Sequence, residues 1–268
     1  MKDLFKFSWQ PELENPSLIL GWDEDAGKLG PRVIEFLNKK IKGKFFSEIE
    51  LGGFFSFRGV TIENDIAQFP ESKFYASERK DLVIFKGSEP QFESYKFLQA
   101  ILDAAQHYCK VKDLYTISGT ISPIPHTSPR RILTVFNQSE FQKRLRDYEL
   151  VDMDYQGPPH INSQLLWVAK KRGILGVSLW PEIPFYLAAV DDLKAQKKVL
   201  EFLDKRFVLG LDLGELDLEI RNQNEKIARL RRENAEINKY INFLEEGIGL
   251  NKEEQMKLTT EIYELLEK

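Results

Sequence analysis

The sequence predicts an α/β protein with a mostly parallel central sheet, helices on both faces of the sheet, and a helical C-terminal segment. Three observations lead to this prediction. Short apolar runs, such as Ser17–Trp22 and Ile174–Leu179, are typical of strands that are buried on both faces. Apolar residues recur at helical spacing between these runs, and strands that alternate with helices favour a parallel sheet. After position 210 the composition changes to a heptad pattern, which predicts helices that pack on one another.

The first half of the chain contains two units in which a strand is followed by a helix. Ser17–Trp22 leads into an acidic loop, Asp23–Gly30, and a helix follows with its apolar face formed by Leu29, Val33, Phe36 and Leu37. Lys73–Ala76 and Asp81–Lys86 flank a polar turn and therefore predict a hairpin. Gly87–Pro90 connects this hairpin to a second helix, whose apolar positions are Tyr95, Leu98, Ile101, Leu102 and Ala105.

A third strand, Leu114–Ser118, ends at Gly119 and enters a loop that contains Pro123, Pro125 and Pro129. Each proline fixes its own φ and restricts the residue before it, so this loop is expected to hold one shape. The body is completed by strands at 131–136 and 174–179, by helices at 139–148 and 164–172, and by a helix that Asp191 or Asp192 caps.

Four loops follow strands that the pattern predicts to be parallel, namely 21–28, 87–90, 119–130 and 180–184. The carboxyl ends of parallel strands lie at one edge of a sheet, which is where α/β folds place their functional sites. We therefore expect a candidate site at this edge, made of residues from these loops and from the loop before helix 164–172. Its members are Asp23, Asp25, Gly27, Glu89, His126, Thr127, Arg130 and Gly157.

The chemistry of these loops has a functional and a structural interpretation. Adjacent carboxylates at 23–25 can hold Mg²⁺ or act as an acid/base pair, but carboxylates also favour helix N-termini, and the capping role is preferred. His126 beside Thr127 and Ser128 offers a base next to a hydroxyl, yet sequence neighbours rarely face one another, so a structural role is preferred. Phosphate-binding glycine motifs and G-x-S-x-G are absent, and three histidines show no metal-ligand spacing. We expect no catalytic residue, no metal and no cofactor.

The 268 residues carry a net charge of -4, with 42% hydrophobic and 30% charged residues. This composition is typical of a folded protein with a substantial core, and the charge argues against a general nucleic-acid-binding surface. No apolar run is long enough to span a bilayer, and the N-terminal end shows no apolar signal core. Cys109 is the only cysteine, which excludes an internal disulfide. We therefore expect a cytoplasmic protein without a membrane or nucleic-acid partner.

From position 213 onwards, apolar residues occupy two positions of a heptad, with charged residues between them. The seam consists of Ile220, Ile227, Leu230, Asn234, Ile237, Ile241 and Leu244, in which Asn234 is a polar residue of the kind that sets register. We predict one long helix over 213–248 and a turn at Gly247 and Gly249. The resulting antiparallel coiled-coil hairpin, Glu215–Glu246 against Asn251–Leu266, would form a second domain, 211–268, beside the body, 1–210. The alternative is that two helices lie on the body.

Five segments of the body, taken in order over about residues 16–207, resemble the proteasome assembly chaperone family. They are G-W-D-E-D-A-G at 21–27, G-S-E-P at 87–90, P-H-T-S-P at 125–129, the loop that begins with the glycine and two prolines at 157–159, and G-I-L-G-V-S-L-W-P-E-I-P-F-Y-L at 173–187. The most similar branch is the bacterial and archaeal one of the second-subunit type, in which the third segment reads P-H-T-R-P. Ser128 therefore stands where that branch has arginine.

The resemblance implies an α/β fold like that of nucleoside phosphorylases and hydrolases, self-association into small rings (a trimer first and a dimer second), and no catalytic activity. It also implies protein partners, proteasome subunits among them. The best-understood members dock on the proteasome through a C-terminal hydrophobic-Tyr-any residue motif, whose letters here, Ile262-Tyr263-Glu264, lie ahead of Leu265–Lys268. We expect a non-enzymatic, self-associating assembly protein. The alternative is a small-molecule-binding protein or an enzyme (a hydrolase, phosphorylase or ATP-grasp-like ligase) in which the carboxyl-edge loops converge on one cavity.

Overall fold

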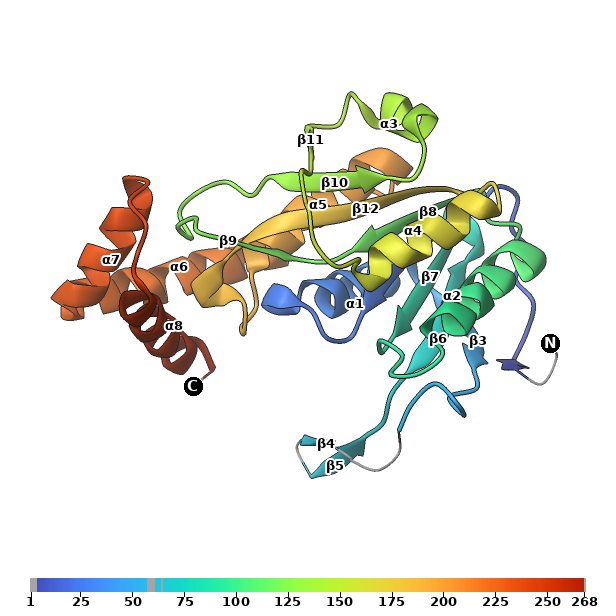
Figure 1. The fold of residues 1–268 in the computed structure, drawn as a ribbon, viewed down its shortest axis with the longest axis horizontal. Coiled ribbons are helices and arrows are strands. Elements are labelled where there is room, and N and C mark those ends of the chain that lie inside the picture. The colour runs from blue at the N-terminus through green and yellow to red at the C-terminus, as the bar shows by residue number, and fades with distance from the viewer. Residues whose placement is uncertain (1–3, 57–60, 64, 268) are drawn as a thin grey trace.

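A large mixed sheet runs through the computed structural model, which describes residues 4–56, 61–63 and 65–267 (Figure 1). Its strand order is β1-β3-β6-β7-β2-β8-β12-β10-β11, and β9 pairs with the end of β12. A separate small sheet contains β4 (Thr61–Glu63) and β5 (Ile66–Gln68). The strands of the large sheet are β1 (Phe5–Phe7), β2 (Ser17–Trp22), β3 (Lys44–Ile49), β6 (Ser72–Ser77), β7 (Leu82–Gly87), β8 (Asp113–Ile117), β9 (Thr120–Ser122), β10 (Ile132–Phe136), β11 (Leu150–Asp152) and β12 (Leu175–Pro184).

The four central strands, β7, β2, β8 and β12, are parallel to one another, as expected. The sheet as a whole is mixed: β9 and β11 also pair in parallel, whereas β1, β3, β6 and β7 pair antiparallel with their neighbours on one side and β10 pairs antiparallel with β12 on the other. The predicted hairpin is β6–β7, and a hairpin reverses the chain direction. The predicted hairpin therefore already implies an antiparallel pair beside the parallel centre of the sheet.

Helices cover both faces of the sheet, and the strands alternate their side chains between the two cores (Figure 1). Ile19 of β2 lies in one core, whereas its neighbours Leu18 and Leu20 lie in the other. The first core is covered by α1 (Leu29–Ile41), α3 (Ser139–Leu145) and α5 (Leu193–Phe207). The second is covered by α2 (Ser94–Asp103), which continues as a π-helical turn over Ala104–Tyr108, and by α4 (Ile161–Lys171).

The segment 180–184, expected as a loop, is the last part of strand β12. It continues because β9, which the sequence pattern did not reveal, pairs with it in parallel: Thr120 lies opposite Glu182 and Ser122 opposite Pro184. A short 3₁₀ turn, Phe185–Leu187, then follows. The extension carries the proline-rich loop beyond the edge at which β2, β7 and β8 end.

The C-terminal segment forms three helices, α6 (Gly214–Glu233), α7 (Ala235–Glu245) and α8 (Lys252–Glu267), so the single helix expected over 213–248 is wrong. Asn234 adopts extended geometry (φ -127°, ψ 100°), and its side-chain oxygen accepts hydrogen bonds from the backbone N–H groups of Glu236 (3.1 Å) and Ile237 (3.2 Å). Asparagine side chains bind nearby backbone groups readily and cap helices for that reason. The residue expected to set register therefore ends α6 and begins α7.

α7 folds back along α6, and α8 packs against both helices and against the turn Phe185–Leu187 (Figure 1). Arg231 joins the first two helices by donating to Asn238, Asn242 and Glu245. Of the predicted seam, Ile220 and Leu230 are half-buried, and the fully buried members are Ile227, Ile237, Ile241 and Leu244. These side chains belong to the same hydrophobic cluster as α1 and α5, so the helices lie on the body. The division at 210/211 into two domains stays a prediction. No helix among the described residues is long and apolar enough to cross a membrane.

Candidate functional site

Asp25 ties together the loops that follow β2 and β8. Its Oδ1 accepts hydrogen bonds from the hydroxyl of Ser118 (2.8 Å), the N–H of Gly119 (3.0 Å) and the N–H of Ala26 (2.9 Å). Its Oδ2 accepts from the N–H of Gly30 (2.9 Å), in the first turn of α1. A carboxylate has about four acceptor positions, and these donors fill them. The arrangement is that of a capping residue.

Burial raises the pKa of Asp25 to about 6, although the hydrogen bonds from Gly119, Ser118, Gly30 and Ala26 act in the opposite direction. A pKa in this range suits a general acid or base. Such a role also needs an oxygen that can reach a substrate, and both oxygens of Asp25 are already bound within the protein. Asp25 therefore holds two loops in register.

Asp23 and Glu89 lie beside this cluster, on the loops after β2 and β7. The hydroxyl of Ser88 donates to Asp23 Oδ2 (2.8 Å), and Lys86 Nζ lies 3.8 Å from Oδ1, which has no hydrogen-bond partner among the described residues. Glu89 lies 3.8 Å from Nε2 of His160, the residue that caps α4. Burial is the main cause that raises the pKa of both carboxyl groups. Within 4–56, 61–63 and 65–267, no three His, Cys, Asp or Glu side chains are placed to hold a metal ion.

His126 lies in a different cluster, built on Tyr186. Its backbone N–H donates to the tyrosine hydroxyl, which lies 2.9 Å from the imidazole Nδ1. Lys194 Nζ donates to the backbone carbonyl of His126 (2.6 Å). Burial lowers the pKa of His126 to about 4, and the positive charges of Lys194 and Arg231 lower it further. The imidazole is therefore neutral at pH 7, and its role in this buried position is to fix the loop.

Arg130 and Thr127 complete the second cluster. Arg130 Nε donates to Asp192 Oδ2 (2.8 Å), and its Nη1 donates to the carbonyl of Ser128 (2.7 Å), so one guanidinium closes the loop and joins it to α5. The hydroxyl of Thr127 donates to Glu245 of α7 (3.0 Å). Arg130, two positions after Ser128, is thus bound within the loop and to Asp192.

The two hydrogen-bonded clusters, one around Asp25 and one around Tyr186, are neighbours. Gly27 joins them: its N–H donates to the carbonyl of Ala188 (2.8 Å), and its carbonyl accepts from the N–H of Asp192 (3.2 Å). Its φ of +67° and the closeness of Ile183 explain why only glycine fits there. Gly157 lies apart from both clusters, on the exposed loop before α4. Whether the eight residues form one functional site stays a prediction.

Four residues that build these clusters escaped the sequence interpretation as site residues: Ser118, Tyr186, Asp192 and Lys194. The sequence pattern indicates Asp192 only as a possible helix cap, which it is. Tyr186 lies in a segment that resembles the chaperone family, and this resemblance is the sequence feature that could have pointed to it. Its hydrogen bonds reach across 60 positions, so no local pattern reveals them.

A model of the PAC2 family matches residues 18–231, from β2 into α6. The chain belongs to the PAC2 family. The resemblance to proteasome assembly chaperones that the loop motifs indicated is thereby confirmed. The matched PAC2 span contains Asp25, His126 and Asp192, and hence the centres of both clusters. No curated protein matches the chain.

Solved structures of similar fold include three whose sequences are less than 25% identical to this chain. PbaB of Pyrococcus furiosus, described as an archaeal proteasome activator, is 22% identical with a TM-score of 0.70, and the match covers 85% of this chain and 98% of that one. The proteasome-assembly chaperone homologue of Mycobacterium tuberculosis is 18% identical with a TM-score of 0.71, covering 85% and 100%. A protein of unknown function from Corynebacterium glutamicum is 19% identical with a TM-score of 0.77, covering 91% and 96%. This PAC2 chain shares the fold of all three.

Proposed function

We propose that this protein is a non-enzymatic, self-associating assembly protein whose partners are other proteins, proteasome subunits among them. Membership of the PAC2 family and the descriptions of two structural neighbours support the class of function. Self-association, in a trimer first and a dimer second, follows from the resemblance to ring-forming chaperones. Exposed side chains at the surface give more direct support for a protein partner than the resemblance does.

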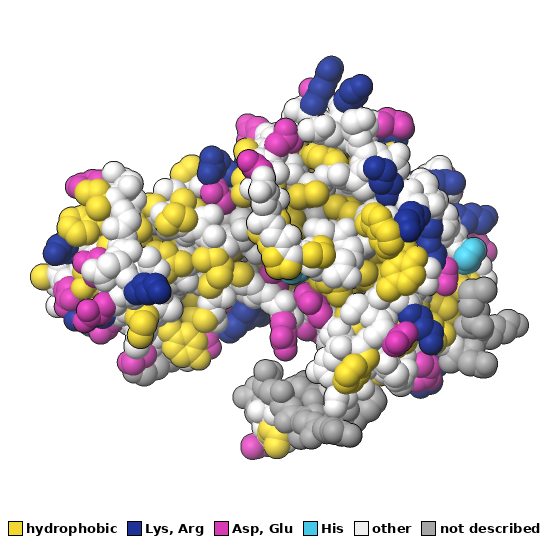
Figure 2. Space-filling model, in the orientation of Figure 1, with side chains coloured by type: hydrophobic (Ala, Val, Ile, Leu, Met, Phe, Trp, Pro, Cys, Tyr) yellow, Lys and Arg dark blue, Asp and Glu magenta, His cyan; other side chains and the backbone are white. Residues whose placement is uncertain are grey.

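The observation that carries the proposal is an exposed aromatic pair on the face formed by α2 and α4. Tyr95 and Trp167 are 47% and 51% exposed, and their ring centroids lie 5.8 Å apart. Lys171 Nζ lies 3.6 Å from the centroid of the Trp167 ring, which is a cation–π contact. Figure 2 shows apolar side chains gathered over α4 and beside α2, with basic side chains around them. Exposed aromatic groups with a charged rim are typical of protein interfaces.

This aromatic face corrects one sequence expectation. Tyr95 was placed on the apolar side of its helix, whereas Leu98, Ile101 and Leu102 are buried and Tyr95 is not. Tyr95 lies in the first turn of α2, beside the buried stripe, and its ring contacts Trp167 of α4 at the surface. We propose that this face contacts a second copy of the chain.

The residues at 262–264, whose letters match the docking motif of the family but which lie ahead of Leu265–Lys268, are partly closed to solvent in this conformation. Ile262 is fully buried in the main hydrophobic cluster, whereas Tyr263, at 46%, and Glu264 are exposed. Both residues lie inside α8. Contact with a proteasome therefore needs a surface other than these residues and other than the aromatic face, which we assign to a second copy of the chain.

Light scattering on the full-length protein tests self-association. We expect a mass about three times the 31.2 kDa of one chain. The double substitution Tyr95→Ser/Trp167→Ser should lower the mass to that of one chain, while the control Tyr263→Ser, which removes an equally exposed aromatic ring from α8, should leave it unchanged. A monomer at high concentration for the unaltered protein overturns self-association. Pull-downs from native lysate with and without residues 211–268 then test whether proteasome subunits bind.

The enzymatic alternative, of the nucleoside phosphorylase, hydrolase or ATP-grasp kind, requires free catalytic groups around one cavity. Asp25 and His126 are instead bound within separate clusters. We expect purified protein to show no hydrolase, phosphorylase or ligase turnover. A specific activity that Asp25→Ala or His126→Ala abolishes, with the fold intact, would favour the enzyme over the non-enzymatic assembly protein.

A further inference from the structure

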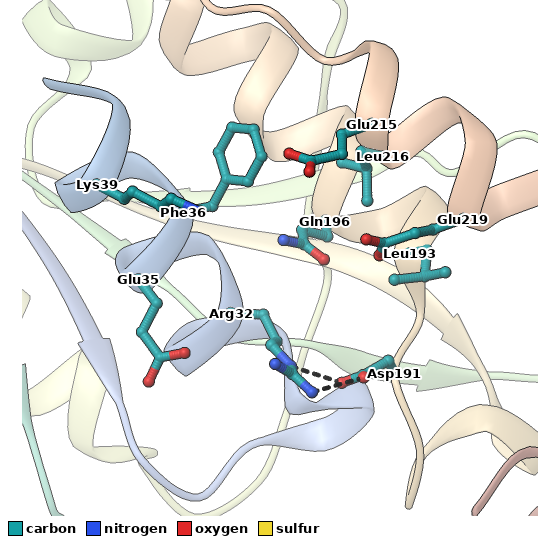
Figure 3. Close-up of a pocket in the computed structure, with 10 residues that line it drawn as sticks. All are labelled: Arg32, Glu35, Phe36, Lys39, Asp191, Leu193, Gln196, Glu215, Leu216 and Glu219. Carbon is teal, nitrogen blue, oxygen red and sulfur yellow. Dashed lines mark hydrogen bonds and ion pairs between the residues drawn. The ribbon is translucent and has the colours of Figure 1, made fainter.

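A cavity of about 480 Å³ lies between α1 and α6, and none of the eight residues of the predicted site lines it (Figure 3). Its apolar surface comes from Phe36, Leu193 and Leu216, which lie on three different helices. Charged side chains of α1 and α6 form the two walls. The cavity is therefore a groove with an apolar floor and charged sides.

Gln196 is a buried polar side chain that points into this groove (Figure 3). It is only 7% exposed, and its amide makes no hydrogen bond with any of the described residues. Its amide is not one of the buried polar atoms that lack a partner, so the amide is in reach of water in the groove. An amide that faces a groove in this way can hydrogen-bond a ligand there.

The charges of the groove favour a cationic ligand. Arg32 is already held by Asp191 through two hydrogen bonds (3.0 and 2.9 Å). Glu215 and Glu219, one turn apart on α6, point into the groove and have no ion-pair partner among the described residues (Figure 3). The opposite wall contributes Lys39. The wall formed by α6 is therefore acidic, although the charge of Arg32 also acts on Glu219.

The groove continues along α6 into a second cavity of about 230 Å³, which is also lined by Asp191, Leu193 and Glu219 and which reaches Glu267 of α8. The two cavities thus share a wall of three residues. A site extended in this way fits a length of polypeptide better than a single small amine, because successive side chains can occupy successive cavities.

We propose that this groove binds a basic segment of a protein partner, with a lysine or arginine side chain inserted beside Gln196. The aliphatic stem of that side chain would lie on Phe36 and Leu216. Its cationic head would donate to the Gln196 side-chain oxygen and to the carboxylates of Glu215 and Glu219. This inference deepens the proposed protein-interaction function by naming the chemistry of the partner, and it uses a surface separate from the aromatic face.

Calorimetric titration of the full-length protein tests the proposal. The probes are the blocked peptide Ala-Lys-Leu-Lys-Ala, its counterpart with glutamate in place of lysine, and free 1,5-diaminopentane. We expect the lysine peptide to bind, the glutamate peptide not to bind, and the diamine to bind at least tenfold more weakly than the lysine peptide. In an NMR titration, the side-chain amide signal of Gln196 should shift and saturate with the lysine peptide.

Matched variants separate this site from general attraction to an acidic protein. Glu215→Gln/Glu219→Gln should weaken the lysine peptide at least tenfold, whereas Glu225→Gln/Glu253→Gln, which removes the same charge from exposed positions outside the groove, should change its affinity less than twofold. Equal losses in both variants, equal affinity for the diamine, or no binding of the peptide at millimolar concentration would each overturn the proposal. Light scattering keeps the two inferences apart: an oligomer that does not bind the peptide contradicts only the groove, and a monomer that binds it contradicts only self-association.

Discussion

Arg130 and Asp192 form an ion pair that is closed to solvent, with Nε and Oδ2 2.8 Å apart and each side chain 1% exposed. Asp192 also caps α5, since its Oδ1 accepts a hydrogen bond from the N–H of Ala195 (3.1 Å). A single carboxylate therefore fixes both the start of a helix and the proline-rich loop, which carries Arg130. The pair ties this loop to α5 beyond the end of β9.

Removing Asp192 should destabilise the protein strongly, because Arg130 would be left buried without a counter-charge. We expect Asp192→Ala to lower the free energy of unfolding by about 3–5 kcal/mol, as measured by urea denaturation. The neighbouring Asp191→Ala is the control: its partner Arg32 is 50% exposed, so the expected loss is about 0–1 kcal/mol. Equal losses for the two variants would mean that the buried pair has no special role.

Acid should weaken the fold through His126. Its pKa is about 4 in the folded protein, and an unfolded histidine titrates near 6.5. The unfolded state therefore takes up a proton first as the pH falls, and stability is lost between about pH 6.5 and 4. At pH 5 the loss from this residue is on the order of 2 kcal/mol. The charged groups that face it are Lys194, Arg231 and Arg130, which oppose protonation, and Glu245, which favours it.

The test compares the unaltered protein with His126→Asn, whose side-chain oxygen can replace Nδ1 as acceptor for Tyr186. The raised pKa of Asp25 acts in the opposite direction, stabilising the fold as the pH falls below about 6, so only the difference between the two proteins isolates the histidine. We expect the variant to lose less stability between pH 7 and pH 5. Identical pH profiles would contradict a neutral, buried His126.

Asp25 should matter for stability and not for catalysis. Asp25→Ala leaves the hydroxyl of Ser118 and the N–H groups of Gly119 and Gly30 without their acceptor, and an unsatisfied buried donor costs about 1–3 kcal/mol. We expect a loss of at least this size in thermal or urea unfolding. Glu24→Ala, at the exposed neighbouring position, should be close to neutral. Unchanged stability of Asp25→Ala would indicate that the carboxylate is kept for a ligand.

Truncating Ile241 tests the proposed domain division. The side chain is fully buried, and Ile→Ala at such a position costs about 2–5 kcal/mol, whereas Ile248→Ala, at a position 47% exposed, should cost far less. If 211–268 is a separate unit, hydrogen exchange in Ile241→Ala should accelerate in α6, α7 and α8 and stay slow in β2 and β8. Equal acceleration in the strands would show that the chain unfolds as one domain.

Local composition was sufficient for the features that depend on near neighbours. The bounds of β2 were predicted correctly, because a strand buried on both faces is apolar throughout. The β6–β7 hairpin and the capping of α5 followed from a polar turn and from an aspartate at the start of a helix. The apolar positions of the tail were also identified, since Ile227, Ile237 and Ile241 are buried as the heptad pattern required.

By itself, then, the sequence determined the α/β class, the strands at the centre of the sheet, the apolar positions of the tail and the family. Tertiary structure alone decided that β9 prolongs β12, that the tail turns at Asn234, and that Asp25 and His126 belong to separate clusters. The reason is the range of the interactions involved. Burial patterns repeat over a few residues, whereas the bonds from Asp25 to Ser118 and from Arg130 to Asp192 join positions 93 and 62 apart, and only the packed sheet brings those positions together.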